Sequence, residues 1–430
     1  MKTKVLMFGW EFPPHISGGL GTASYGLTKG LAKHGVKILF VMPKAGGDED
    51  QSAVKIINAS DVEMMETYSN HEDYWDFVRF IEIGSNLTPY LDPELFEKEA
   101  SETVHSSAGA KERISFRNKF QFSGRYGINL MEEVARYALV AGTIAAQQEF
   151  DIIHAHDWLA YTAGIVAKRV SGKPLVVHVH ATEFDRSGEN INQQVYDIER
   201  RGMHAADRVI AVSNLTRNIV IKHYGIAPEK VVTVHNAVDF QSYKEMKVER
   251  GVPEKVVTFL GRVTYQKGPE YFIEAANKVL KYYPDARFVM AGSGDMLNRS
   301  IRRVAQLKIA TRFHFTGFLY GDDVQRMFAQ SDVYVMPSVS EPFGISPLEA
   351  MRSGVPTIIS KQSGVSEVLV HSIKVDFWDV DAMADAIYGL LAYPALARVA
   401  GREGLEEVDQ LKWENAAWKI KCLYEEITGA

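Results

Sequence analysis

Short, unbroken apolar segments recur along the whole chain, and each is followed by a loop and then by a helical pattern. Apolar runs of this length are typical of parallel strands whose sheet is covered on both faces. The chain should therefore fold into repeated β-α units with right-handed crossovers. In the first half the predicted strands are residues 5–8, 36–42, 152–155, 175–179, 209–212 and 231–234.

The same rhythm restarts in the second half after a polar stretch at 239–253, which we interpret as a linker. The predicted strands there are residues 256–260, 287–291, 312–315, 332–336 and 357–360. A chain of 430 residues exceeds what one core usually holds. We therefore predict an α/β protein with two doubly wound, Rossmann-like domains facing a cleft.

The domain boundaries follow from these patterns. We place an N-terminal domain at 1–240 and a C-terminal domain at 252–408, followed by an amphipathic helix at 409–430. The stretch at about 48–136 shows little strand signal and is interpreted as an insertion of loops and helices.

The composition excludes several classes of protein. The net charge of -6 gives no general attraction to nucleic acid. A single cysteine, Cys422, fits a reducing compartment. We see no secretory signal and no apolar run long enough to span a membrane. We therefore expect a cytoplasmic protein without integral membrane contact, while the sequence carries no indication of its oligomeric state.

Two segments of the first half place polar residues at the end of a predicted strand, where doubly wound folds bind ligands. Gly18 and Gly19 lie in a loop before a helical pattern, and such glycines let backbone N–H groups approach an anion. A plain turn would look the same. In His154-Ala155-His156-Asp157-Trp158 we expect His154 to be structural and Asp157 to be functional, and no further ligand nearby supports a metal site.

His180 follows the apolar strand at 175–179 and shares one side of it with His178. At the strand end a neutral imidazole could hydrogen-bond a sugar hydroxyl group, so we assign His180 to the site. We expect His178 to be a core residue.

The second half holds the stronger motifs. Arg262 and Lys267 share one loop after a strand and could converge on a diphosphate, although loop cations are often merely solvated. The stretch from Glu341 to Glu349 places one carboxylate in a loop and the other in the first turn of a helix. Carboxylates accept hydrogen bonds from sugar hydroxyl groups, and a helix start favours anions, although both charges could also be ordinary.

Together these motifs resemble the retaining GT-B glycosyltransferases, whose E-x7-E motif is matched by Glu341 and Glu349 and whose R-x4-K clamp is matched by Arg262 and Lys267. The resemblance covers essentially the whole chain and is closest to family 4 members of the glycogen synthase type. One difference is that Ile16-Ser17-Gly18-Gly19-Leu20 lacks the lysine of classical bacterial glycogen synthases, which weakens the case for ADP-glucose as donor.

The resemblance implies that the domain at 1–240 is the acceptor side, that the domain at 252–408 binds the nucleotide sugar, and that the helix at 409–430 packs back on the N-terminal domain. It also implies a role for each matched residue. Arg262 and Lys267 would hold the donor diphosphate, Glu341 the hydroxyl groups of the donor sugar, and Glu349 the ribose. His180 would contact the sugar at its 6-hydroxyl, and Asp157 would shape the sugar site. The remaining donor-binding candidates are Gly18, Gly19, Gly292, Phe343, Gly344 and Ile345.

The expected reaction is transfer of a hexose, with glucose preferred, from UDP- or ADP-glucose to an acceptor hydroxyl group, with α-glucan as the first acceptor to consider. The resemblance implies front-face attack with retention, without a metal or other cofactor. The sequence leaves open another acceptor, a nucleotide-sugar epimerase on this fold, a dinucleotide-dependent oxidoreductase and a non-catalytic binder. The aromatic residues at about 48–136 could form an acceptor surface, which favours transfer, or could simply pack the insertion. The missing G-x-G-x-x-G counts against a dinucleotide enzyme.

Overall fold

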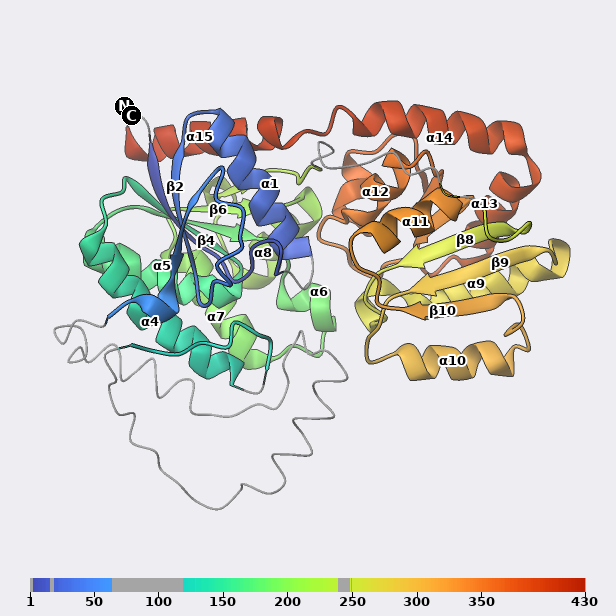
Figure 1. The fold of residues 1–430 in the computed structure, drawn as a ribbon, viewed down its shortest axis with the longest axis horizontal. Coiled ribbons are helices and arrows are strands. Elements are labelled where there is room, and N and C mark those ends of the chain that lie inside the picture. The colour runs from blue at the N-terminus through green and yellow to red at the C-terminus, as the bar shows by residue number, and fades with distance from the viewer. Residues whose placement is uncertain are drawn as a thin grey trace, which may run out of the picture.

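The computed structural model describes residues 3–15, 19–63, 119–127, 129–238, 248 and 250–429. Figure 1 shows two α/β domains side by side, with the blue-to-green first domain on the left and the yellow-to-orange second domain on the right. The described part of the first domain contains a seven-stranded parallel sheet in the order β3-β2-β1-β4-β5-β6-β7. Its strands are β1 (Lys4–Phe8), β2 (Lys37–Met42), β3 (Lys55–Asn58), β4 (Ile152–His156), β5 (Leu175–Val179), β6 (Arg208–Ala211) and β7 (Val231–Thr233).

Helices cover both faces of this first sheet. One face carries alternate strand residues such as Leu6, Ile153 and Val177, and they pack against α4, α5 and α7. The residues that alternate with these along each strand, such as Val5 and Ile152, face α1 and α15. The helical segments of this domain are α1 (Gly19–Lys33), η1 (Ala59–Asp61), α4 (Leu130–Gln147), α5 (Trp158–Ser171), α6 (Glu183–Ser187), α7 (Gln193–Ala205), α8 (Asn214–Tyr224) and η3 (Pro228–Lys230).

The second domain contains a six-stranded parallel sheet in the order β10-β9-β8-β11-β12-β13. Both sheets therefore have the doubly wound topology that the strand pattern predicts. The strands are β8 (Lys255–Leu260), β9 (Ala286–Ala291), β10 (Phe313–Gly317), β11 (Val333–Met336), β12 (Thr357–Ser360) and β13 (Ile373–Val375). The helical segments are η4 (Tyr265–Lys267), α9 (Pro269–Tyr282), α10 (Leu297–Gln306), α11 (Asp322–Gln330), α12 (Ser346–Arg352), η5 (Gly364–Glu367), α13 (Val380–Ala392) and α14 (Pro394–Val408).

The last helix, α15 (Trp413–Thr428), returns to the first domain and lies along α1. Two glycines of α1 make this close packing possible. A Cβ on Gly26 would lie 2.1 Å from the Trp413 indole, and one on Gly30 would lie 2.8 Å from the Cβ of Ala417. Where the chain crosses between domains, Val238 pairs with Lys412, so the outgoing and returning segments lie together.

The interpretation of residues 48–136 as an insertion is wrong in part. Lys55–Asn58 is the edge strand β3, and α4, which begins at Leu130, packs in the core of the first domain. Among the described residues β3 lies at the edge of the sheet and is partly exposed, and its four residues are too few for a clear apolar pattern. Residues 64–118, with the aromatic residues proposed as an acceptor surface, lie outside the described residues. No helix in the described ranges has the length and apolar character needed to cross a bilayer.

Candidate functional site

Two loops of the second domain bring opposite charges together. Lys267 ends the short helix η4 after β8, and Glu341 lies in the loop after β11. The Lys267 ammonium pairs with Oε2 of Glu341, and the Ser338 hydroxyl donates a hydrogen bond to the same oxygen at 3.1 Å. Only 8% of the Glu341 side chain and 20% of the Lys267 side chain are exposed. The pair is therefore poorly solvated, and a ligand that reached it would meet strong electrostatic interactions.

Backbone contacts fix both loops. The N–H of Val339 donates to the carbonyl of Gln266 at 2.9 Å, and the N–H of Glu341 donates to the carbonyl of Gln362 at 2.9 Å. Gly268 follows Lys267 with a positive φ of 64°, and a Cβ there would lie 2.2 Å from the carbonyl oxygen of Pro337. Only glycine fits this contact, so the loop that carries Lys267 is held directly against the end of β11.

Arg262 and Gly292 lie at the carboxyl ends of the neighbouring strands β8 and β9. Gly292 has a φ of 139°, and a Cβ on it would lie 1.8 Å from the carbonyl oxygen of Gly261. The structure thus gives Gly292 a packing reason to be glycine, namely the close approach of the two strand ends. Arg262, next to Gly261, is half-buried in the same loop as Lys267.

The segment after Glu341 leads into α12. Phe343 is buried, Gly344 has a positive φ of 101°, and Ile345 precedes the helix. Glu349 lies in the first turn of α12 as predicted, and burial raises the pKa of its carboxyl group to about 7. The Ile345 side chain also approaches the first domain, since its Cδ1 lies 3.9 Å from where a Cβ of Gly19 would be. Gly18 lies outside the described residues.

In the first domain, Asp157 and His180 are joined at the ends of β4 and β5. Oδ1 of Asp157 accepts hydrogen bonds from the backbone N–H of His180 at 2.9 Å and of Ala181 at 3.3 Å. Asp157 is 3% exposed and has a φ of 59°, which is unusual for a residue other than glycine. Burial raises the pKa of Asp157 to about 6, with Arg186 acting in the opposite direction. Asp157 therefore fixes the backbone that carries His180.

A buried ionic cluster holds the short helix α6 that follows His180. Arg186 pairs with Glu183 at 3.1 Å and also with Glu199, and all three side chains are at most 5% exposed. Thr182 and Asp185 form a capping box at the start of the helix. From there, Oδ1 of Asp185 accepts a hydrogen bond from the Ser340 hydroxyl at 2.6 Å, which connects α6 to the second domain next to Glu341.

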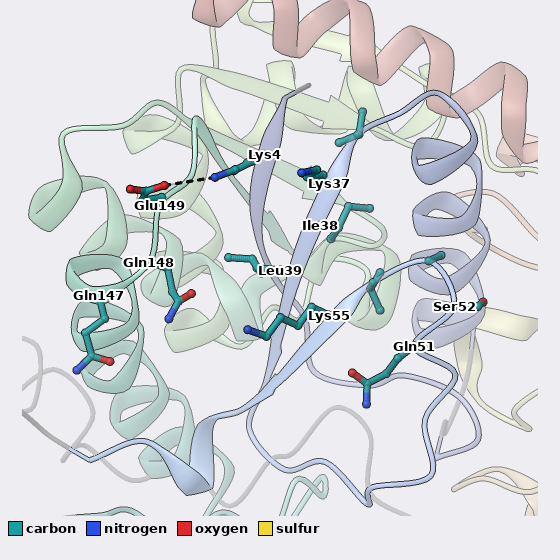
Figure 2. Close-up of a pocket in the computed structure, with 13 residues that line it drawn as sticks. Lys4, Lys37, Ile38, Leu39, Gln51, Ser52, Lys55, Gln147, Gln148 and Glu149 are labelled. Carbon is teal, nitrogen blue, oxygen red and sulfur yellow. Dashed lines mark hydrogen bonds and ion pairs between the residues drawn. The ribbon is translucent and has the colours of Figure 1, made fainter. Parts of the chain in front are cut away.

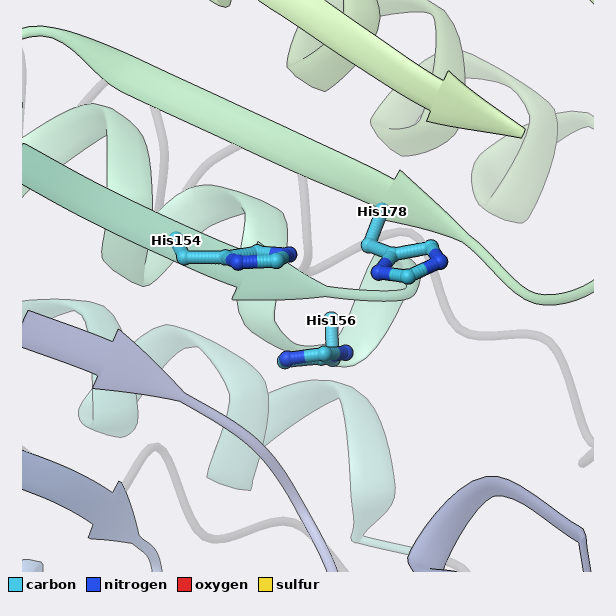
Figure 3. Close-up of side chains that lie close together, drawn as sticks. All are labelled: His154, His156 and His178. Atoms are coloured by element: carbon cyan, nitrogen blue, oxygen red, sulfur yellow. The ribbon is translucent and has the colours of Figure 1, made fainter. Parts of the chain in front are cut away.

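Three buried histidines raise the question of a metal. Figure 3 shows His154 and His156 on β4 and His178 on β5 with their rings close together, and their nitrogen atoms lie within 4.8 Å of one another. The rings are stacked, however, with interplanar angles of 13°, 18° and 28°. The nitrogen lone pairs of nearly parallel rings do not converge on one point, whereas the ligands of a tetrahedral Zn²⁺ must converge. This arrangement does not fit a shared metal ion.

A cavity of about 790 Å³ lies elsewhere, at the amino ends of β1 and β2 and beside β3. Figure 2 shows Lys4, Lys37 and Lys55 along it, with Lys4 paired to Glu149 at 3.4 Å. The loops described above follow the carboxyl ends of the strands. This cavity therefore belongs to the opposite edge of the first sheet and is separate from the candidate site.

The structure thus joins Lys267 to Glu341 and Asp157 to His180, and it links the two groups through Asp185 and Ser340. Sequence reasoning did not single out Asp185, Ser340 or Ser338. The Thr-x-x-Asp pattern at Thr182 is a helix-start signature and could have pointed to Asp185. No local signal marks Ser340, because its partner is 155 residues away.

Comparisons with known proteins follow the same division of the chain. Residues 17–242 match the family model described as "Glycosyltransferase Family 4", and residues 243–406 match "Glycosyl transferases group 1". An uncharacterized glycosyltransferase from Methanocaldococcus jannaschii is 27% identical, over 86% of this chain and 83% of its own. A glycogen synthase from Mycobacterium tuberculosis is 23% identical, over 98% of this chain and 94% of its own.

Among solved structures, sucrose-phosphate synthase from Thermosynechococcus elongatus superposes with a TM-score of 0.70. It is 18% identical, and the match covers 100% of both chains. At this identity the likeness concerns the fold, and it confirms the predicted arrangement of two doubly wound domains.

Proposed function

The chain belongs to glycosyltransferase family 4 and is a glycosyltransferase that uses a nucleotide sugar, and on that premise we propose that it transfers glucose to an α-glucan. The donor in this proposal is UDP- or ADP-glucose, and the anomeric configuration is retained. The near full-length similarity to a protein named glycogen synthase supports the choice of sugar and acceptor.

The observation that carries the proposal is the buried contact between Lys267 and Glu341. A donor sugar nucleotide presents both a diphosphate, which needs cations, and hydroxyl groups, which need acceptors. Lys267 supplies the first and Glu341 the second, from loops that backbone hydrogen bonds hold in place. In the absence of donor the two side chains neutralise each other, so the site avoids an unpaired buried charge.

We assign the other residues around this pair in the same way. Arg262 joins Lys267 on the diphosphate, Glu349 binds the ribose, and the backbone at Gly18, Gly19 and Gly292 lets the phosphates approach. The proposed donor site also includes Phe343, Gly344 and Ile345, which lie between the two carboxylates in sequence. His180 binds the 6-hydroxyl of the sugar as a neutral imidazole, since burial lowers its pKa to about 3.

The proposed reaction follows from these roles. The bond from the anomeric carbon to the phosphate oxygen breaks, and its electron pair leaves with the diphosphate. The acceptor hydroxyl oxygen bonds to the anomeric carbon from the same face, and its proton passes to the departing phosphate oxygen. Arg262 and Lys267 stabilise the charge on the leaving group, so we propose that the enzyme requires no metal or other cofactor.

The test incubates the protein with UDP-glucose, ADP-glucose or GDP-mannose, with and without a short α-1,4-glucan. Nucleoside diphosphate release and the anomeric configuration of the product are measured, with a further arm in EDTA. The proposal expects release that needs both a glucose donor and the glucan, an α-linked product, and no effect of EDTA. Release that needs a different acceptor would overturn the glucan assignment. Conversion of the donor sugar without any acceptor would indicate an epimerase instead.

A further inference from the structure

Four imidazole rings form a continuous stack at the ends of β4 and β5. Ring centroids are 4.4 Å apart for His154 and His156, and 4.3 Å apart for His178 and His180. The two pairs also contact each other, with 5.2 Å between His156 and His178 and 5.2 Å between His156 and His180. Three of the rings are fully buried, and His180 ends the stack at the site.

Hydrogen bonding distinguishes the members of this stack. Nδ1 of His156 and Nε2 of His180 lie 2.9 Å apart and share a hydrogen bond. Both nitrogens of His178 and the remaining nitrogens of His156 and His180 have no partner among the described residues. A hydrogen bond between two neutral imidazoles needs one N–H and one lone pair, so each ring fixes the tautomer of the other. His156 is therefore the ring that controls His180, while His178 only packs against it.

His180 is thus held at two points by consecutive residues. Asp157 accepts hydrogen bonds from the backbone N–H groups of His180 and Ala181. Nδ1 of His156 shares a hydrogen bond with Nε2 of His180. Nδ1 of His180 is enclosed and has no hydrogen-bond partner among the described residues, so the bond to His156 is what orients the ring there. The strained backbone of Asp157 places the two contacts side by side, and such strain persists where the surrounding structure fixes it.

We propose that His156 is a positioning residue for the transferase reaction, whose hydrogen bond to Nε2 holds the His180 ring in one orientation at the sugar site. This inference depends on the proposed role of His180. His156 touches no substrate and acts only through the neighbouring ring, as a partner that orients a functional imidazole commonly does.

The test compares a variant that removes the hydrogen bond to His180 with a variant that removes an imidazole without this hydrogen bond. His156→Phe keeps a stacked ring but loses Nδ1, and His178→Phe is the matched control in the same stack. We expect His156→Phe to lower kcat at least about tenfold, as misplacement of a positioned group does, with a smaller change in donor KM. His178→Phe should keep wild-type kcat. His156→Asn should restore most of the activity, because its side-chain amide reaches the position of Nδ1.

A double-mutant cycle with His180→Ala separates positioning from a merely structural role. In that background His156→Phe should change kcat by less than about twofold, since residues that act as a unit are non-additive. Additive losses, or equal losses in His156→Phe and His178→Phe, would overturn the inference. If His156→Phe does not fold, as judged by its melting curve, His156→Leu takes its place. Absence of transfer in the wild type, or full activity in His180→Ala, would instead reject the proposed function or the role of His180.

Discussion

The Ser340 hydroxyl of the second domain donates a 2.6 Å hydrogen bond to Oδ1 of Asp185 in the first domain. Ser340 immediately precedes Glu341, and Asp185 belongs to the capping box of the helix that follows His180. This hydrogen bond therefore joins the two halves of the candidate site directly. Glu367 of the second domain makes a further connection by accepting hydrogen bonds from the backbone N–H groups of Asn214 and Leu215 at 2.8 Å each.

Loss of the Ser340 hydroxyl should weaken donor binding without unfolding the protein. Ser340→Ala removes a hydrogen bond worth about 1 kcal/mol, so we expect donor KM to rise about fivefold. The control is Ser366→Ala, because that hydroxyl donates only to carbonyl oxygens of its own domain. Initial-rate kinetics of both variants provide the measurement. Equal KM values for Ser340→Ala and wild type would show that the contact has no part in donor binding.

The buried cluster around Arg186 should be important for stability. Arg186→Met leaves the carboxylates of Glu183 and Glu199 without their common partner, and breaking such a buried group costs about 3–5 kcal/mol. Urea unfolding measures the loss. Arg326→Met is the control, because its ion pair with Asp323 is 57% exposed on both sides and contributes below about 1 kcal/mol. A similar unfolding midpoint for both variants would contradict a structural role for the cluster.

The histidine stack should make the protein sensitive to acid. Burial lowers the pKa of His154 from 6.5 to about 3 and holds the pKa of His178 well below 6.5. The unfolded chain then binds more protons than the folded one below pH 6.5, so stability present above that pH is lost on acidification. Each buried histidine contributes about 1.4 kcal/mol per pH unit to this loss.

The variant that tests this is His178→Phe, which removes one titrating ring and keeps the stack. Between pH 6.5 and 5 its free energy of unfolding should fall by about 2 kcal/mol less than that of the wild type. Glu199 acts in the opposite direction, because burial raises its pKa to about 7. Since both proteins contain Glu199, its contribution cancels in the comparison. Urea titrations at the two pH values check it, and parallel losses in both proteins would contradict the buried, neutral state of His178.

The sequence was sufficient for the doubly wound fold because its information is local. Apolar strands such as Leu175–Val179 and the helix start before Glu349 are visible in a few residues. Local sequence patterns also predicted that Lys267 and Glu341 lie in loops at strand ends, where the topology brings them together. Parallel strands with their carboxyl ends on one edge leave few other arrangements.

The features that the sequence could not predict depend on partners that are distant along the chain. The edge strand Lys55–Asn58 pairs with β2 and has just two consecutive apolar residues, so the sequence pattern does not predict it. The contact of Ser340 with Asp185 and the ring pairing of His156 with His180 join different strands or domains. Each of these residues is ordinary in its own segment, and only the folded chain gives it a role.

Lys267 and Glu341 form the proposed donor site. The most direct test of their role is the initial rate of acceptor-dependent nucleoside diphosphate release from the preferred donor. Lys267→Ala is compared with Lys255→Ala, which removes a lysine of the same domain from its 2.8 Å ion pair with Asp332. We predict that kcat/KM falls about 100-fold in Lys267→Ala, as when one stabilising group is lost, and is unchanged in Lys255→Ala. Equal activity of the two variants would contradict the account.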